Sequence, residues 1–410
     1  MKFLPLVVCT LVGACVGNDY DTGAGGAGSD VGSDGSGDLT NLVEDPAEIP
    51  SCAAVSTVIL YSESTYELRL PLAFAQNQDP CTRYYVDLPH LSADTTMPRG
   101  DADKVHALGA GFHAMAEFSW SGWRAWIDAS PGTRNWELAG KAFRQRMIDA
   151  GYDVAAGDTW VINEFPSTTR TGAEDVWTHE RSAVKGLFEG SGTPSKGVVF
   201  VAGMGQTLQN FAVYKPNVES WLRQSAWWND MDSYVRFMSY EVYADPHYDC
   251  VIGSNVQADA DNLNAFLEHL PRLAALGGSQ SAAASAFLTH ASVPLVQASW
   301  NSNGGFGNNI ISLLDFEKFS RLQIYATHLW SAHHESPGRR IGFAWAPRSS
   351  TAAQEAELSS VIATSVLRSY PAGGFYNLGK YACAIDGSLD GCGCTVAGSY
   401  NGGWGTFASW

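Results

Sequence analysis

The sequence is short of positive charge. It has 25 Lys and Arg residues against 42 Asp and Glu residues, and its formal net charge is −17. Proteins that bind nucleic acid through electrostatic attraction need basic patches, and this sequence has no basic run interleaved with aromatic residues. We therefore expect no nucleic-acid partner.

Several catalytic motifs are also missing. The chain has no Gly-x-Ser-x-Gly motif, which argues against a serine hydrolase of the usual α/β type. His179-Glu180 lacks the second His that zinc proteases place four residues after the first. His328, His333 and His334 are not spaced to lie one turn apart on one helix face. We therefore expect no metal site and no cofactor. The alternative is metal binding by this histidine cluster or by Cys392 and Cys394.

The start of the chain has the layout of a secretory signal. One basic residue, Lys2, is followed by a short apolar run and then by small residues. Val12-Gly13-Ala14-Cys15 also resembles a lipobox, in which the cysteine is lipidated and becomes the new first residue. We expect residues 1–15 to be a lipoprotein-type signal peptide, and a lipid on Cys15 to anchor an exported protein to the membrane of the bacterial cell envelope. The alternative is an ordinary signal with an incidental cysteine, which gives a secreted protein.

Residues 16–50 differ in composition from the rest of the chain. They hold eight acidic residues and no Lys or Arg, and Gly, Ser and Asp dominate. Such a segment has too little apolar surface to offset the entropy lost on ordering. We expect a disordered acidic tether, with weak calcium binding by its spaced Asp residues as the alternative. The 360 residues from position 51 onward are enough for one large barrel or two ordinary domains.

Six cysteines lie beyond the signal and the tether. An even number in an oxidising compartment predicts three disulfides, and six cysteines allow 15 pairings. The favoured pair is Cys52 with Cys81, which would close an N-terminal hairpin-like segment. Cys383 with Cys392 or Cys394 comes next. The disulfide candidates are Cys52, Cys81, Cys250, Cys383, Cys392 and Cys394.

Short apolar segments alternate with helical segments from about residue 82 onward. Seven such alternations predict a parallel sheet with crossover helices. In the first long helix, Asn135 is a plausible N-cap and Gly151 a plausible stop. The strands are expected at 83–89, 112–120, 158–165, 197–203, 235–243, 293–300 and 340–346. The helices are expected at 135–150, 178–188, 218–233, 259–276, 314–332 and 352–370.

A closed barrel of this type needs an eighth strand, for which 55–61 and a segment near 375–385 are the candidates. An open doubly wound sheet is the alternative. It usually carries a Gly-rich turn that opens a helix, whereas Gly109-x-Gly111-x-x-Ala114 precedes a strand. We therefore predict an α/β fold, a (β/α)8 TIM-type barrel over 51–370 with irregular disulfide-bearing N- and C-terminal extensions. A cap rich in Gly, Cys and aromatic residues is expected at 371–410.

Acidic residues occur where such barrels place catalytic groups, at the C-terminal ends of strands and in the loops that follow. Four qualify: Asp87, Glu117, Glu164 and Glu241. A carboxylate at the end of a buried strand must be hydrogen-bonded, paired or functional. Cleavage of a glycosidic bond requires two carboxyl groups. One protonates the leaving oxygen, and the other attacks the sugar or activates water.

Trp160-Val-Ile-Asn163-Glu164-Phe165-Pro166 resembles the fourth-strand motif of the large clan of (β/α)8 glycoside hydrolases, in which an Asn-Glu pair ends the strand. The resemblance implies that Glu164 is the acid/base and that Asn163 binds the sugar hydroxyl next to the scissile centre. Phe343-Ala344-Trp345 resembles the last strand of that clan, where a Trp floors the sugar site. We expect a carbohydrate ligand, bound by Asn163, Glu117, Asp87, Trp300 and Trp345.

The sequence departs from the clan at the nucleophile. The clan has a Glu on its seventh strand, and the matching strand here carries Gln297. Glu241, one strand earlier, is the expected second carboxylate, and Glu117 is the substitute for it. This departure favours a second hypothesis, a non-catalytic surface protein that binds carbohydrate on the same scaffold.

A third hypothesis is a surface lipoprotein with a purely structural or interaction role. On that hypothesis the acidic residues form structural ion pairs, and the Trp residues pack against helices. The candidate ion pairs are Glu164 with Arg170 or Arg181, and Glu241 with Arg236 or Arg340.

Overall fold

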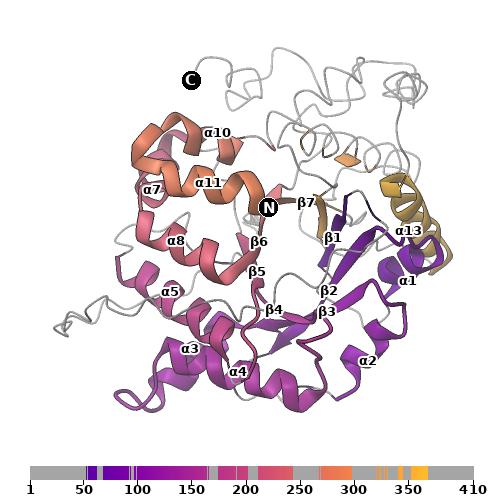
Figure 1. Ribbon diagram of the computed structural model, residues 1–410, viewed down its shortest axis with the longest axis horizontal. Helices are drawn as coiled ribbons and strands as arrows, with labels where there is room; N and C mark the ends of the chain where they lie inside the picture. Colours follow the sequence, from indigo (N-terminus) through magenta and orange to yellow (C-terminus); the bar gives the residue numbers. More distant parts are fainter. Residues whose placement is uncertain are drawn as a thin grey trace, which may run out of the picture. The chain divides into compact units, whose positions relative to one another are not determined.

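Eight parallel strands form a closed barrel in the computed structural model of this chain (Figure 1). In chain order, which is also their order around the barrel, they are β1 (Ser56–Tyr61), β2 (Thr82–Leu91), β3 (Phe112–Phe118), β4 (Thr159–Ile162), β5 (Gly197–Val201), β6 (Val235–Val242), β7 (Ser292–Gln297) and β8 (Arg340–Ala344). The structure describes residues 52, 54–61, 68–91, 93, 97, 99–163, 165, 174–190, 192–201, 211–242, 267, 269–297, 320, 323–324, 327, 330, 340–344 and 352–367.

The first strand closes the barrel. β1 pairs in parallel with β2 on one side and with β8 on the other, so that Thr57 lies level with both Arg83 and Arg340. The prediction of a (β/α)8 barrel is confirmed, and the open sheet is excluded. The eighth strand is the one expected at 55–61. The other candidate, near 375–385, lies outside the described residues.

Alternation along the strands creates two apolar layers, because successive side chains point to opposite faces. One layer fills the barrel, and the other lies between the strands and the helices. β5 is buried along its whole length, as expected of a strand covered on both faces. We call the first layer the inner cluster. It consists of Ile59, Tyr61, Tyr85, Met115, Val161, Val198, Phe200, Val293, Leu295 and Ala344, with Phe237 packed against it.

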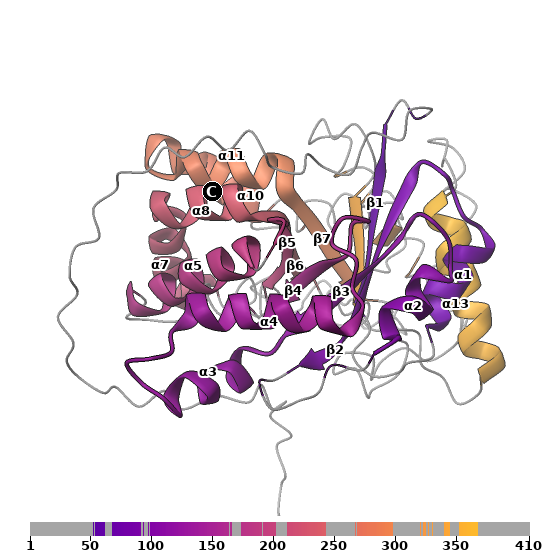
Figure 2. The ribbon, with the colours of Figure 1, turned by 60° about the horizontal axis from the view of Figure 1, so that its bottom comes forward.

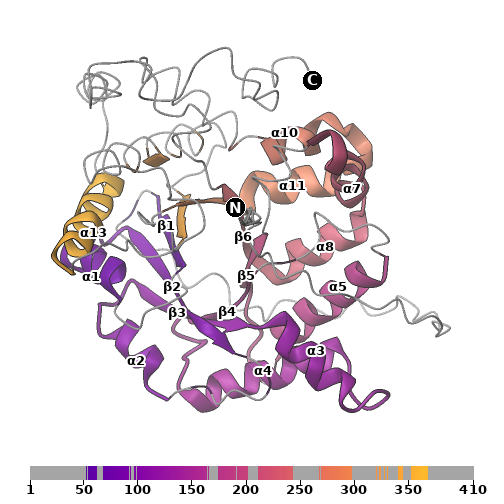
Figure 3. The same ribbon diagram turned by 180° about the vertical axis from the view of Figure 1, so that it is seen from behind.

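Helices surround the ring of strands (Figures 1 and 3). The last of them, α13, lies beside α1 (Figure 2). Arg69 of α1 forms an ion pair with Glu355 of α13. None of the described helices is long and apolar enough to cross a membrane. The helices are α1 (Arg69–Gln76), α2 (Asp101–His106), α3 (Trp120–Asp128), α4 (Trp136–Ala150), α5 (Glu174–Glu189), α7 (Phe211–Leu222), α8 (Ser225–Tyr234), α10 (His269–Leu276), α11 (Ala282–Ala291) and α13 (Ala352–Leu367), with a short 3-10 turn η2 (Gly278–Ser281).

The ends of α4 are those that the sequence predicts. The side chain of Asn135 accepts a hydrogen bond from the backbone N–H of Leu138 at 2.8 Å, which caps the first turn. Gly151 ends the helix with a φ of 101°, a conformation that costs glycine little.

The single helix expected at 218–233 is wrong, because the chain forms two helices there, α7 and α8. The carbonyl of Trp221 accepts hydrogen bonds from the backbone N–H of Gln224 at 2.9 Å and from the buried indole N–H of Trp228 at 3.0 Å. These bonds satisfy a carbonyl that the end of α7 would otherwise leave without a partner. Four helices, α1, α2, α3 and α11, were not predicted at all.

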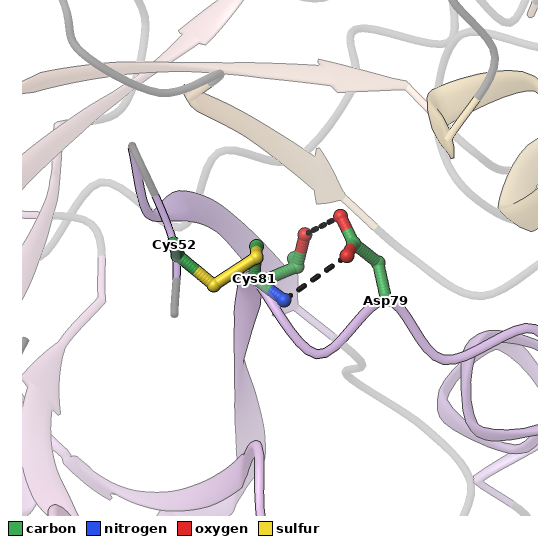
Figure 4. Close-up of a disulfide and its surroundings, with 4 residues drawn as sticks. Cys52, Asp79 and Cys81 are labelled. Carbon is green, nitrogen blue, oxygen red and sulfur yellow. Dashed lines mark hydrogen bonds between the residues drawn. A yellow bond between two sulfur atoms is a disulfide. The ribbon is translucent and has the colours of Figure 1, made fainter. Parts of the chain in front are cut away.

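A disulfide joins Cys52 to Cys81, with their Cα atoms 5.6 Å apart (Figure 4). The favoured pairing is therefore confirmed, but the expected hairpin-like segment is wrong. The disulfide ties the chain ahead of β1 to the start of β2, and these two strands are parallel and joined by α1. Asp79 accepts hydrogen bonds from the Cys81 N–H at 3.0 Å and from the Thr82 hydroxyl at 2.9 Å. The other four candidate cysteines lie outside the described residues.

Two glycines allow α4 and α5 to pack closely. A Cβ atom on Gly140 would lie 2.5 Å from the backbone nitrogen of Leu187, and a Cβ on Gly186 would overlap the carbonyl oxygen of Glu137. Both neighbours are backbone atoms, which cannot rotate away as a side chain does. The crossing therefore depends on the absence of side chains at these two positions.

We expect Gly186→Ala to lower the free energy of unfolding by about 3 kcal/mol, the upper end of the usual cost of overpacking. Gly151→Ala is the control, because its added Cβ meets no atom within 4 Å. It should lower the free energy of unfolding only by the strain of an alanine in the left-handed conformation, about 1 kcal/mol. Urea denaturation of both variants measures the difference. Equal destabilisation by the two substitutions would contradict the close packing described here.

Candidate functional site

The carboxyl ends of three successive strands present polar side chains to the barrel interior. Asp87 lies in β2, Glu117 lies in β3, and Asn163 directly follows β4. Each is two residues beyond a member of the inner cluster, so alternation directs it to the same inner face. All three are buried, with exposed fractions of 1%, 0% and 8%. These three predicted residues form the candidate site.

The strand register places the three side chains in one stepped group. Asp87 lies level with Met115 of β3, and Glu117 lies level with Val161 of β4. From Asp87 to Glu117, and again from Glu117 to Asn163, the site therefore moves one strand around the barrel and two residues along the strand. With strands about 4.8 Å apart and a rise of about 3.3 Å per residue, neighbouring Cα atoms are about 8 Å apart. Carboxyl and amide side chains can interact with one ligand over that distance.

The inner cluster forms an apolar floor beneath the site. The rings of Tyr61 in β1 and Phe200 in β5 meet edge to face, with centroids 5.0 Å apart. β1 and β5 are opposite strands of the barrel, so this pair crosses its interior. Hydrogen bonds and charges above such a floor act in a low dielectric, where they are stronger than in water.

Asn163 has an unused acceptor. Its Oδ1 atom is buried and has no hydrogen-bond partner among the described residues. An unsatisfied buried acceptor costs about 1–3 kcal/mol, and a hydroxyl group is a donor that removes this cost. The arrangement is therefore suited to a ligand that carries hydroxyl groups.

Phe165 anchors the chain just beyond the site. Its N–H donates to the carbonyl of Phe200 at 2.7 Å. Its ring lies 6.2 Å from the ring of Trp120 and 5.8 Å from that of Trp227. Glu164, the predicted acid/base, lies outside the described residues. The residues on either side of it in the sequence, Asn163 and Phe165, are both buried.

Glu180 of α5 is a further buried carboxylate, and in the sequence it belongs to an incomplete zinc motif. Its Oε2 atom accepts a hydrogen bond from the indole N–H of Trp227 in α8 at 2.8 Å. This contact lies among the helices and holds α5 against α8.

Core packing accounts for most of the described Trp residues. The fully buried ones are Trp123, Trp160, Trp221, Trp227, Trp228 and Trp330.

Two further predicted positions lie at strand ends. Glu241 belongs to β6, where its backbone pairs with Leu295. Gln297 is the last residue of β7 and lies level with Ala344 of β8. The remaining predicted site residues, Trp300 and Trp345, lie outside the described residues, as does Cys15.

Two of the arginines proposed as structural partners have other contacts. Arg181 pairs with Asp230 at 2.5 Å, and Arg236 donates to the hydroxyl of Tyr85 at 2.5 Å. Within the described part of the chain, no group of three or more His, Cys, Asp and Glu side chains could hold a metal ion.

The amino-terminal end of the barrel has the opposite chemistry. Arg83 lies level with Thr57, as does Arg340, and the Arg83 guanidinium donates to the ring of His113 at 3.3 Å. Arg236 follows the first residue of β6, at an irregularity in its pairing with β5. The guanidinium of Arg236 lies 5.7 Å from the ring centre of Tyr85. Sequence reasoning missed this group, although each basic residue lies at or near the start of its strand.

His113 is held in its neutral form. Burial, together with the positive charges of Arg83 and Arg236, lowers the pKa of its ring to about 4. A neutral ring accepts a hydrogen bond from Arg83, which an imidazolium could not do.

No protein-family model matches the chain, and no curated protein sequence matches it. Among solved structures, a glucosidase from Croceicoccus marinus is similar, with a TM-score of 0.39 and 10% sequence identity. The match covers 76% of this chain and 62% of that chain, so this protein spans less than two thirds of the glucosidase. Such a similarity concerns the fold alone.

Stability should fall as the pH drops from about 6.5 to about 4, because in that window the unfolded chain protonates His113 and the folded chain does not. The lowered pKa of His113 should reduce the free energy of unfolding by roughly 3 kcal/mol across this pH window. The measurement is the free energy of unfolding at several pH values for the wild type and for His113→Gln. The difference between the two should change across this window, and parallel curves would contradict a neutral buried His113.

Proposed function

We propose that this protein is a glycoside hydrolase-like barrel that binds and cleaves a carbohydrate at the carboxyl ends of its strands. One observation carries the proposal. Asp87, Glu117 and Asn163 are buried on the inner face of the barrel, at the end where barrels of this fold hold their chemistry. Buried acids beside an unused amide acceptor suit a ligand rich in hydroxyl groups.

The proposed reaction uses two carboxyl groups. Glu164 donates a proton to the leaving oxygen as the glycosidic bond breaks, and Asn163 binds the neighbouring hydroxyl. As that bond breaks, Glu241 either attacks the sugar carbon, to form a glycosyl-enzyme that water hydrolyses with Glu164 as the base, or takes a proton from a water molecule that attacks the same carbon. Glu117 is the substitute for Glu241. A separation of about 5–5.5 Å between the two carboxyl groups gives retention, and about 6.5–9.5 Å gives inversion.

The remaining predicted residues are assigned to substrate binding. Trp300 and Trp345 each follow a strand in the sequence, and an indole face is a suitable platform for a sugar ring. Asp87 accepts hydrogen bonds from substrate hydroxyls beside Glu117. We propose no cofactor and no metal for this reaction, because two carboxyl groups and water are sufficient for it.

A second function is favoured by Gln297. It ends β7, the strand on which the related clan carries its nucleophile, and an amide is neither a nucleophile nor a base at neutral pH. A chain with this residue could bind carbohydrate without cleaving it. The two functions share one ligand class and differ in the fate of the bound sugar.

Hydrolysis of a panel of polysaccharides and aryl glycosides by the full chain tests the enzyme. We expect Glu164→Gln to lower kcat by about 10²–10⁴-fold on polysaccharides, the usual contribution of a general acid. On aryl glycosides with acidic leaving groups, the kcat of Glu164→Gln should fall less, because the leaving oxygen of these substrates needs little protonation. Glu241→Gln should lose activity on both substrate types.

The matched control is Glu180→Gln, which alters a buried carboxylate outside the candidate site. It should lower the thermal midpoint and leave kcat nearly unchanged. Equal losses in Glu180→Gln and Glu164→Gln would refute the catalytic assignment. An absence of hydrolysis, together with glycan binding that Asn163→Ala abolishes, would establish the binding function instead.

We further propose that the protein is an exported lipoprotein of the bacterial cell envelope, held at the membrane by a lipid on Cys15. Three features support this: the signal-like start, the lipobox resemblance, and the Cys52–Cys81 disulfide, since such bonds persist in oxidising compartments.

Cys15→Ala should move the protein from the membrane fraction to the soluble fraction of bacteria that express it. Mass spectrometry of the N-terminal peptide should find a lipidated Cys15 as the first residue in the wild type only. An unmodified cysteine within an intact or differently cleaved N-terminus would rule out the lipid anchor.

A further inference from the structure

The alternation of side chains breaks once along β4 and the residues that follow it. Trp160 and Ile162 face the helices, and Val161 between them belongs to the inner cluster. Strict alternation would turn the residue at position 165 to the inner face. Phe165 instead belongs to the outer apolar layer, where its ring meets the rings of two helices. The chain therefore carries one extra residue between Ile162 and Phe165.

The hydrogen bonds show the same extra residue. In the parallel pairs of this barrel, an N–H donates to the carbonyl of the residue before its partner on the next strand. Ile162 lies level with Val199, so a regular register would bond the N–H of residue 164 to the carbonyl of Phe200. The N–H of Phe165 makes that bond instead, at 2.7 Å. One extra residue in one strand of a pair is a β-bulge.

The ring of Phe165 fixes the bulge from outside the barrel. It lies edge to face with Trp120 at the start of α3 and is tilted against Trp227 of α8, so two helices hold it. Trp120 is itself stacked on Trp136 of α4, with ring centroids 4.0 Å apart. A regular register would move the Phe165 ring out of this layer and turn the acid at position 164 into it. Burial of a carboxylate among apolar rings is costly, so the packing favours the bulge.

A bulge bends its strand and re-aims the side chain at the break. Asn163 stands at this break, directly after the last residue of β4, and its buried Oδ1 atom has no partner in the described part of the chain. We propose that Phe165 is a positioning residue, whose ring holds the bulge and thereby aims the Asn163 amide at a ligand hydroxyl. The identity of that ligand rests on the proposed function, whereas the bulge does not depend on it.

Substrate discrimination by the full chain tests this role. The probes are 4-nitrophenyl glucoside and its 2-deoxy analogue, which lacks the hydroxyl next to the scissile bond, each as both anomers. The ratio of their kcat/KM values should fall about 10-fold in Asn163→Ala, which removes the acceptor of that hydroxyl. Phe165→Leu keeps an apolar side chain without the ring contacts, and should lower the ratio about 3-fold or more through a partial loss of the same hydrogen bond. In the Asn163→Ala background it should change the ratio no further, because the two residues act as one unit.

Phe287→Leu is the matched control. Phe287 is also buried in the outer apolar layer, with its ring 5.8 Å from that of Trp228 in α8, but it lies on α11. Both Phe variants should lower the thermal midpoint, because each loses a buried ring. Only Phe165→Leu should change the ratio. If the protein binds the glucosides without cleaving them, the ratio of the two dissociation constants is the readout.

Amide hydrogen exchange makes the test independent of the substrate. The amide of Phe165 should exchange slowly in the wild type and in Phe287→Leu, and faster in Phe165→Leu. If neither probe is bound or cleaved, the result counts against the proposed function, and the exchange alone decides whether the ring holds the bulge. Equal changes of the ratio in the two Phe variants, a further fall in the Asn163→Ala background, or equal exchange of the Phe165 amide in all three proteins would each overturn the proposal.

Discussion

The pairing of β1 with β8 is the constraint on which the rest of the structure depends. Once the last strand pairs with the first, alternate residues of every strand must share one interior of limited volume. Apolar side chains fill the middle of that interior, so polar groups are accommodated at its two ends. Asp87, Glu117 and Asn163 gather at the carboxyl end, and the arginines with His113 gather at the amino end. Closure thus produces two chemically opposite sites from strands that each contribute one or two residues.

Much of the fold follows from the sequence, because a run of buried strands alternating with helices has few other ways to cover both faces of a sheet. The errors lie where tertiary contacts decide. Residues 218–233 have a helical composition throughout, yet the indole of Trp228 satisfies the carbonyl of Trp221, and the chain turns at Gln224. The short helices α1 and α2 were missed because six to eight residues give too little periodicity to detect.

The carboxyl-end site could be predicted residue by residue but not as a group. Asp87 and Glu117 can each be predicted, because each is an acid with apolar neighbours at the end of a strand. That both lie on the same inner face depends on the strand register, and no local sequence pattern determines the register. The arginines were missed for the same reason. Each is a single basic residue near the start of a strand, and only closure brings β2, β6 and β8 to one end. The roles of Glu164, Glu241, Trp300 and Trp345 remain predictions.

The two ends of the barrel influence each other through the apolar middle. Arg83 and Asp87 are four residues apart on β2, which is about 13 Å along an extended strand. Opposite charges at that distance attract by roughly 1 kcal/mol at an effective dielectric constant near 20. The arginines therefore favour negative charge at the candidate site, as a carboxylate nucleophile or base requires. A proton donor must instead be neutral, which suits a residue beyond the strand ends, such as Glu164. The charge of the amino end therefore sets part of the electrostatic environment in which the carboxyl end works.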